Sequence, residues 1–187
     1  MNIVRRALFV LSLFAVSTVG AAEWKMLPQG SRLGFFITYA GQEAPGLFHR
    51  FATELQFDPS APAGGRLVVT VTVPSADLDS EDINAAIAGP EWFDFERFAE
   101  ARFVSESIVG AGDGHFIATG PLRLKGIERV IEVPFSWSEA GGLAHMRGEL
   151  TLQRTAFGIG TGEWAGSDVI GRKVRVRFDV ALQRVHE

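Results

Sequence analysis

Residues 120–129 read Gly120-Pro121-Leu122-Arg123-Leu124-Lys125-Gly126-Ile127-Glu128-Arg129. This stretch has the pattern of a strand, a tight turn at Lys125-Gly126 and a returning strand. Glycine adopts the backbone angles of tight turns at little cost. We therefore predict a β-hairpin here, and a hairpin implies antiparallel pairing.

Outward from this hairpin, apolar and polar residues alternate along most of the chain. Such alternation is typical of strands with one buried face and one wet face, as in antiparallel sheets. Short strands separated by Gly, Pro, Asp and Ser turns favour an all-β barrel or sandwich. The alternating apolar positions are Leu33, Phe35, Ile37, Tyr39, Phe51, Leu55, Phe57, Leu67, Val69, Val71, Val73, Ile131, Val133, Phe135, Trp137, Val174, Val176, Phe178, Val180 and Leu182.

Residues 79–88 break the alternation and predict a short helix. Ser80 or Asp79 can cap its start, and the acidic residues that follow suit the positive end of a helix. Gly89-Pro90 ends it. Residues 90–98 predict a second helical turn. The helix residues expected to face inward are Ile83, Ala86 and Ile87.

The N-terminal residues 1–22 have the pattern of a cleavable signal peptide. Arg5-Arg6 precedes a run of ten residues, 7–16, that are apolar except for Ser12, and small residues end the segment at Ala22. A membrane anchor is the alternative, but this run is too short to span a bilayer. We expect residues 23–187 to form one domain in the periplasm. The chain has no cysteine, which excludes disulfides and thiolate metal sites.

The charge balance argues against one class of partner. The chain holds 18 Lys and Arg against 22 Asp and Glu, a net charge of −4 that becomes more negative once Arg5 and Arg6 are removed. Nucleic-acid binding needs a basic footprint, so we expect no nucleic acid to bind.

Further motifs follow in a fixed order along the chain. With the hairpin, they resemble the YceI family of secreted, lipocalin-like proteins that bind long apolar lipids, over about residues 23–183. The resemblance implies an antiparallel lipocalin-like barrel of about eight strands with one or two short helices. The motifs are Ser31-Arg32-Leu33-Gly34-Phe35, Gly46-Leu47-Phe48, Phe57-Asp58-Pro59, Trp92-Phe93-Asp94 and Arg154-Thr155-Ala156-Phe157-Gly158-Ile159.

The inward faces are rich in aromatic residues, with 15 Phe and 4 Trp in the chain. These side chains either fill a dry core or line an elongated cavity. The resemblance implies the cavity, holding an isoprenoid lipid or a ubiquinone-like molecule. The alternative is an interaction protein with a filled barrel, acting in envelope stress or assembly. The candidate ligand-binding residues are Phe35, Ile37, Leu55, Phe57, Val69, Val71, Phe135, Trp137, Arg154, Phe157, Trp164 and Phe178.

Three of these candidates, Arg154, Phe157 and Trp164, lie in residues 154–166, a segment that ends in a glycine-rich loop, residues 158–166. Trp164 is either a gate at a cavity mouth or part of an ordinary turn. Arg154 either meets a polar lipid head or is paired internally. The loop contains a G-x-G-x-x-A match, but no helix pattern follows it, so dinucleotide binding is not expected. Gly162-Glu163-Trp164 also resembles a subgroup linked to cytochrome b561-type membrane proteins, which implies a membrane redox partner.

The remaining sequence offers little catalytic chemistry. The four histidines are far apart and have no metal-ligand spacing, and no G-x-S-x-G motif is present. We therefore expect a binding protein without a metal or cofactor, and not an enzyme.

Overall fold

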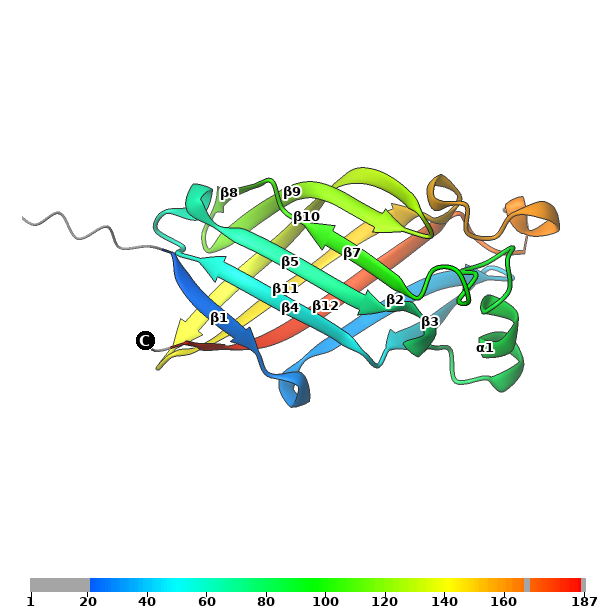
Figure 1. Cartoon of the computed structure of the whole chain (residues 1–187), viewed down its shortest axis with the longest axis horizontal. Helices are drawn as coiled ribbons and strands as arrows, with labels where there is room; N and C mark the ends of the chain where they lie inside the picture. The colour runs from blue at the N-terminus through cyan, green and yellow to red at the C-terminus, as the bar shows by residue number, and fades with distance from the viewer. Residues whose placement is uncertain (1–20, 167–168, 186–187) are drawn as a thin grey trace, which may run out of the picture.

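The computed structural model describes residues 21–166 and 169–185. In this part of the chain, eight antiparallel strands pair in the order β1-β4-β5-β7-β9-β10-β11-β12, and β1 also pairs with β12 to close a barrel (Figure 1). The predicted antiparallel barrel of about eight strands is confirmed. The strands are β1 (Ala22–Met26), β4 (Phe51–Phe57), β5 (Arg66–Thr72), β7 (Glu100–Val104), β9 (His115–Leu124), β10 (Ile127–Ala140), β11 (Leu143–Gln153) and β12 (Lys173–Arg184).

Four further strands extend the barrel wall. The hairpin of β2 (Arg32–Tyr39) and β3 (Gln42–Phe48) pairs with the first half of β12, whereas β1 pairs with its second half. Two short strands, β6 (Ala76–Asp77) and β8 (Ser107–Gly112), pair with β3 and β9. The predicted leader, residues 1–22, lies outside the described residues except for its last two, and Ala22 begins β1.

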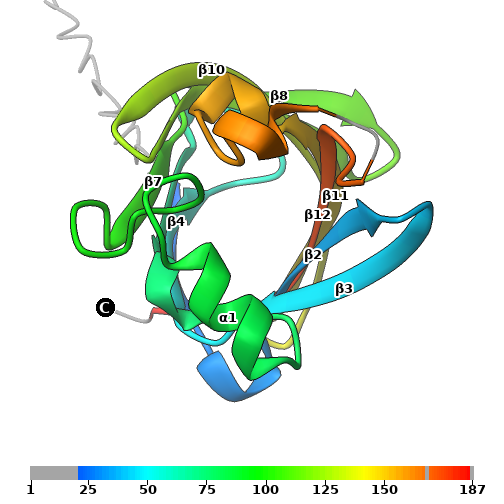
Figure 2. The same ribbon diagram turned by 90° about the vertical axis from the view of Figure 1, so that its right-hand side faces the viewer.

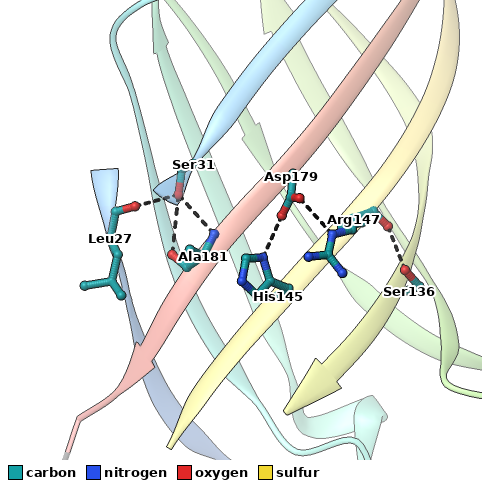
Figure 3. Close-up of polar contacts among 7 residues, drawn as sticks. All are labelled: Leu27, Ser31, Ser136, His145, Arg147, Asp179 and Ala181. Atoms are coloured by element: carbon teal, nitrogen blue, oxygen red, sulfur yellow. Dashed lines mark hydrogen bonds and ion pairs between the residues drawn. The ribbon is translucent and has the colours of Figure 1, made fainter. Parts of the chain in front are cut away.

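The break between β1 and β2 stays bonded to β12 through the Leu27 amide, which donates to the Ala181 carbonyl, and through the Ser31 hydroxyl. A 3-10 turn, η1 (Pro28–Gly30), separates the two strands. Ser31 Oγ donates to the Leu27 carbonyl at 2.8 Å and accepts from the Ala181 amide at 3.0 Å (Figure 3). The wall therefore remains continuous where the strand itself is interrupted.

The hairpin of residues 120–129 forms as predicted. β9 and β10 pair from Leu124↔Ile127 onward, and the two turn residues, Lys125 and Gly126, have φ of 49° and 73°. Two consecutive positive φ values are those of a type I′ turn, whose twist matches that of the flanking strands. Gly120 has a separate role, because a Cβ there would collide with the carbonyl oxygen of Val104.

The helix prediction was right in place and partly wrong in orientation. Helix α1 (Glu81–Ile87) is capped by Ser80, whose Oγ accepts from the Ile83 amide at 3.4 Å. Only Ile87 is buried, while Ile83 and Ala86 are exposed, since this short helix lies across the barrel end and turns only its last residue inward. Residues 90–98 form hydrogen-bonded turns instead of the second helical turn. Within the described residues, no helix is long and apolar enough to cross a membrane.

The end of the barrel opposite α1 is filled by packed aromatic rings, which we call the floor. Its rings come from Trp24, Phe57, Phe116, Phe135 and Trp137. Phe57 makes edge-on contacts with Phe116 and Trp137, with ring centroids 4.9 and 5.1 Å apart. Edge-on aromatic pairs add about 0.5–1.5 kcal/mol beyond the area they bury. The floor therefore closes one end of the barrel and leaves any internal space toward α1.

Candidate functional site

An apolar cavity of about 200 Å³ lies between the floor and α1. Aliphatic and aromatic side chains from nearly every barrel strand line it, and Thr53 and Arg154 are the only hydroxyl-bearing or charged side chains in its lining. Pockets for small ligands typically measure roughly 300–1,000 Å³. The space therefore suits an apolar segment, and a long chain would need room beyond it.

Eight of the alternating apolar positions were expected to point into the barrel, and all do so: Phe35, Ile37, Leu55, Phe57, Val69, Val71, Phe135 and Phe178. Only some of the candidate binding residues, however, line the cavity. Leu55, Phe57, Phe135 and Trp137 belong to the packed core around the floor, and Trp164 lies outside the lining. A pattern of period two marks an inward face but does not tell whether a partner side chain or a void lies opposite. The candidates that line the cavity are Phe35, Ile37, Val69, Val71, Arg154, Phe157 and Phe178.

Arg154 is paired internally, and the residue is 3% exposed. It starts the cap loop, which we define as residues 154–166 and 169–172. Its guanidinium donates to six backbone carbonyl oxygens at 2.6–3.0 Å. An arginine has five N–H groups, so none is left for a lipid head. Burial lowers the pKa of Arg154, but a guanidinium stays charged in proteins. The accepting residues are Ile159, Gly160, Trp164, Gly166, Ile170 and Gly171.

Two more contacts fasten the cap loop to its neighbours. Lys125 Nζ donates to the carbonyl oxygens of Pro90 and Gly158 at 2.8 and 2.7 Å, and desolvation lowers the pKa of this amine. Trp92 packs against Trp164 with ring centroids 5.8 Å apart. The turn of the β9–β10 hairpin, the segment 90–98 and the cap loop are thus joined.

The end of the cavity along the barrel axis is covered. Figure 2 looks onto this end, where α1 crosses one side and the 3-10 turns η4 (Arg154–Phe157) and η5 (Gly162–Ala165) cross the other. Four buried apolar side chains face the cavity from these segments: Ile87, Phe157, Ile159 and Ile170. The glycine-rich loop, for which the sequence left open a cavity mouth or an ordinary turn, lies over this end and donates backbone carbonyl oxygens to Arg154.

The wall has an opening between β10 and β11. These two strands pair with each other only from Ser136↔Arg147 to Ala140↔Leu143. Nearer the cap, β10 still pairs with β9 and β11 still pairs with β12, but β10 and β11 do not pair with each other. Pro134, which has no backbone N–H to donate, stands just beyond the last pair. A surface depression lies there, and Ile131, Leu150 and Leu152 line both it and the cavity. Both strands alternate normally, so only Pro134 signals this opening in the sequence.

The outer face of β11 and β12 carries charged side chains. Asp179 pairs with His145 and Arg147, each at 2.7 Å, and these bonds lower the pKa of its carboxyl despite desolvation (Figure 3). Ser136 Oγ donates to the backbone carbonyl oxygen of Arg147. In residues 21–166 and 169–185, no group of three His, Cys, Asp or Glu side chains is placed to hold a metal ion.

A closed antiparallel barrel with a plugged end and an apolar internal cavity defines a lipocalin-like class of protein. The family model of the YceI-like domain matches residues 24–182, and the chain belongs to this family. Among curated relatives, a UPF0312 protein of Shewanella oneidensis is 27% identical over 163 residues, covering 86% of this chain and 75% of the relative.

Solved structures share the barrel. Burkholderia cenocepacia BcnA is 30% identical and superposes with a TM-score of 0.81, covering 83% of this chain and 98% of BcnA. A polyisoprenoid binding domain from Saccharophagus degradans, implicated in plant cell wall breakdown, superposes with a TM-score of 0.71 over 87% of this chain and 98% of that domain. It is 12% identical, so this likeness establishes the fold alone.

Proposed function

We propose that this chain is a periplasmic binding or carrier protein for an isoprenoid lipid or a ubiquinone-like molecule. The observation that carries the proposal is the cavity, which is covered, lined by apolar side chains and located where a lipocalin-like barrel holds its ligand. The Saccharophagus degradans domain, which shares the fold, is a polyisoprenoid binding domain.

The energetics are adequate for a modest ligand. Burying about ten methylene groups contributes about 8 kcal/mol, which corresponds to micromolar affinity before ordering costs. The apolar wall supplies this term without a charged anchor, since Arg154 already donates to six carbonyl oxygens. We propose binding and release of the ligand without chemical change.

Purification from the native host followed by native mass spectrometry tests the proposal. We expect an added mass that organic extraction removes and that chromatography identifies as an isoprenoid. Titration of the emptied protein with a short-chain ubiquinone should raise its melting temperature. In the matched control Val71→Trp, a larger side chain occupies the cavity, so the added mass and the thermal shift should be lost. No added mass in either protein and no thermal shift would contradict the carrier.

The second candidate is an interaction protein in the envelope, and the packed floor favours it. Five aromatic rings already fill one end of the barrel. A filled barrel would have side chains packed in this way along its whole length. The relatives described above give no support to a cytochrome b561-type partner. The residues that suggested one form η5, whose Trp164 packs against Trp92. Failure of every lipid probe to bind would favour this second function.

The periplasmic location rests on residues 1–22 and has its own test. Cell fractionation should place the full-length gene product in the periplasm at the size of residues 23–187. Deletion of residues 2–22 should retain it in the cytoplasm. Recovery of uncleaved protein in the membrane pellet would show that the segment is an anchor instead.

A further inference from the structure

Thr53 carries a buried hydroxyl for which the described residues supply no partner. Its residue is 4% exposed, it lines the cavity, and its Oγ1 accepts and donates no hydrogen bond. A buried hydroxyl without a partner costs about 1–3 kcal/mol. Valine has nearly the same shape and avoids this cost, so threonine here needs an explanation outside the empty barrel.

The position of Thr53 is deep in the cavity. On β4 it pairs with Val69, and the next inward residue along the strand, Leu55, already belongs to the packed core and does not line the cavity. Rotation about the Cα–Cβ bond exchanges the hydroxyl and the methyl group, so the hydroxyl can turn toward a ligand. The charged side chain of the lining, Arg154, has no N–H to spare.

We propose that Thr53 is a specificity residue that hydrogen-bonds an uncharged oxygen of the ligand at the deep end of the cavity. This inference rests on the proposed function. A hydroxyl, carbonyl or ether oxygen satisfies Thr53 without bringing charge into an apolar site, whereas a phosphate would be buried without a free cation beside it. The ligand then lies with its oxygen toward the floor and its apolar chain toward the cap.

The test compares two probes of equal chain length, decylubiquinone and decylbenzene, on the native protein, Thr53→Val and Thr53→Ser. Thr53→Val should lower the affinity for decylubiquinone about three- to ten-fold, which corresponds to the loss of one hydrogen bond, and leave the affinity for decylbenzene unchanged. Thr53→Ser keeps the hydroxyl and should retain affinity for decylubiquinone. The empty Thr53→Val protein should melt at a higher temperature than the native one, because the unpaired hydroxyl is gone.

The outcomes separate this inference from the proposed function. If decylubiquinone binds Thr53→Val as tightly as the native protein, the role of Thr53 is wrong and the carrier stands. Tighter binding of farnesyl phosphate than of decylubiquinone would also overturn the proposal that the oxygen bound by Thr53 is uncharged. If neither decyl probe binds the native protein, the carrier itself fails, and the role of Thr53 fails with it.

The opening between β10 and β11 supports a second, independent inference. The axial end of the cavity is covered by four buried side chains of α1 and the cap loop, with the half-buried Trp92 and Phe93 beside them. Ile131, Leu150 and Leu152 are half-buried beside the opening and line both the cavity and the surface depression. The cavity is also too small for a long chain. We infer that the apolar chain of the ligand passes through the wall between β10 and β11.

Cross-linking across the opening tests this route. The chain has no cysteine, so Glu132→Cys/Thr151→Cys introduces the only two thiols, one on each side of the opening. Bridging them with a bismaleimide should slow decylubiquinone release at least ten-fold. The control pair, Glu132→Cys/Thr119→Cys, joins β10 to β9 where the wall is already paired, and should leave the rate unchanged. Equal release rates from the two cross-linked proteins would overturn the route.

Discussion

The guanidinium of Arg154 donates a hydrogen bond to the carbonyl oxygen of Trp164 over 2.6 Å. This bond joins the two residues of the segment 154–166 for which the sequence left a role at the ligand open, and it shows that they contact each other. Arg154 organises the cap loop from inside, and the Trp164 ring packs outward against Trp92. The cap loop is therefore held by backbone carbonyls around one buried cation.

Replacing Arg154 should destabilise the protein strongly. Arg154→Ala leaves six carbonyl oxygens without their donor, and we expect the free energy of unfolding to fall by about 3 kcal/mol or more. Arg154→Lys should rescue only partly, because an ammonium cannot reproduce the planar fork. Urea denaturation measures both variants. Arg66→Ala, at an exposed arginine at the start of β5, is the control and should stay within about 0.5 kcal/mol of the native protein.

Lys125→Asn should separate the turn from the cap. Asn-Gly is the favoured sequence of a type I′ turn, so the β9–β10 hairpin should be retained. The two hydrogen bonds from Nζ to Pro90 and Gly158 are lost. Hydrogen exchange of residues 90–98 and 154–162 should therefore accelerate while that of β9 and β10 stays unchanged. Faster exchange throughout the hairpin would mean that Lys125 serves the turn instead.

Acid should loosen helix α1 before it unfolds the barrel. Asp77 accepts hydrogen bonds from His49 and Asn84, which lower its pKa from 3.8 to about 2. Because the folded pKa is depressed, this contribution is complete above about pH 4 and is lost as the pH falls through about 2. Asn84 belongs to α1, so amide protection in α1, corrected for intrinsic exchange rates, should fall over this window. In Asp77→Asn the protection should be lower at pH 5 and no longer vary with pH down to 2.

Substitutions at the floor and at the cavity wall should have different costs. Phe57→Ala removes a fully buried ring from the floor, and we expect the free energy of unfolding to fall by about 3–5 kcal/mol. Val71→Ala enlarges a space that is already empty, so its cost should remain below about 1.5 kcal/mol while decylubiquinone still binds. If urea denaturation gives the same loss in free energy of unfolding for both variants, the side chains around Val71 must already be packed against one another and the cavity is not empty.

The strands, their inward faces and the β9–β10 turn could be predicted from sequence because each depends on neighbouring residues. Period-two alternation sets which side chains share a face, and Lys125-Gly126 suits consecutive positive φ values. The inward orientation of α1 was predicted less well. Helical spacing placed Ile83 inward, but what the helix rests on depends on segments far away in the chain.

By itself, the pattern of alternation and turns determined an antiparallel all-β fold, a barrel or a sandwich, with an aromatic interior, because alternation and turn chemistry are local properties; the resemblance to the YceI family selected the barrel. Only the tertiary structure decided which interior positions are empty. Phe35 and Phe57 have the same pattern in sequence, yet one lines the cavity and the other fills the floor. Only the fold also decides that Arg154 finds six carbonyl partners while the Thr53 hydroxyl finds none, since hydrogen-bond satisfaction is settled by what lies within about 3 Å.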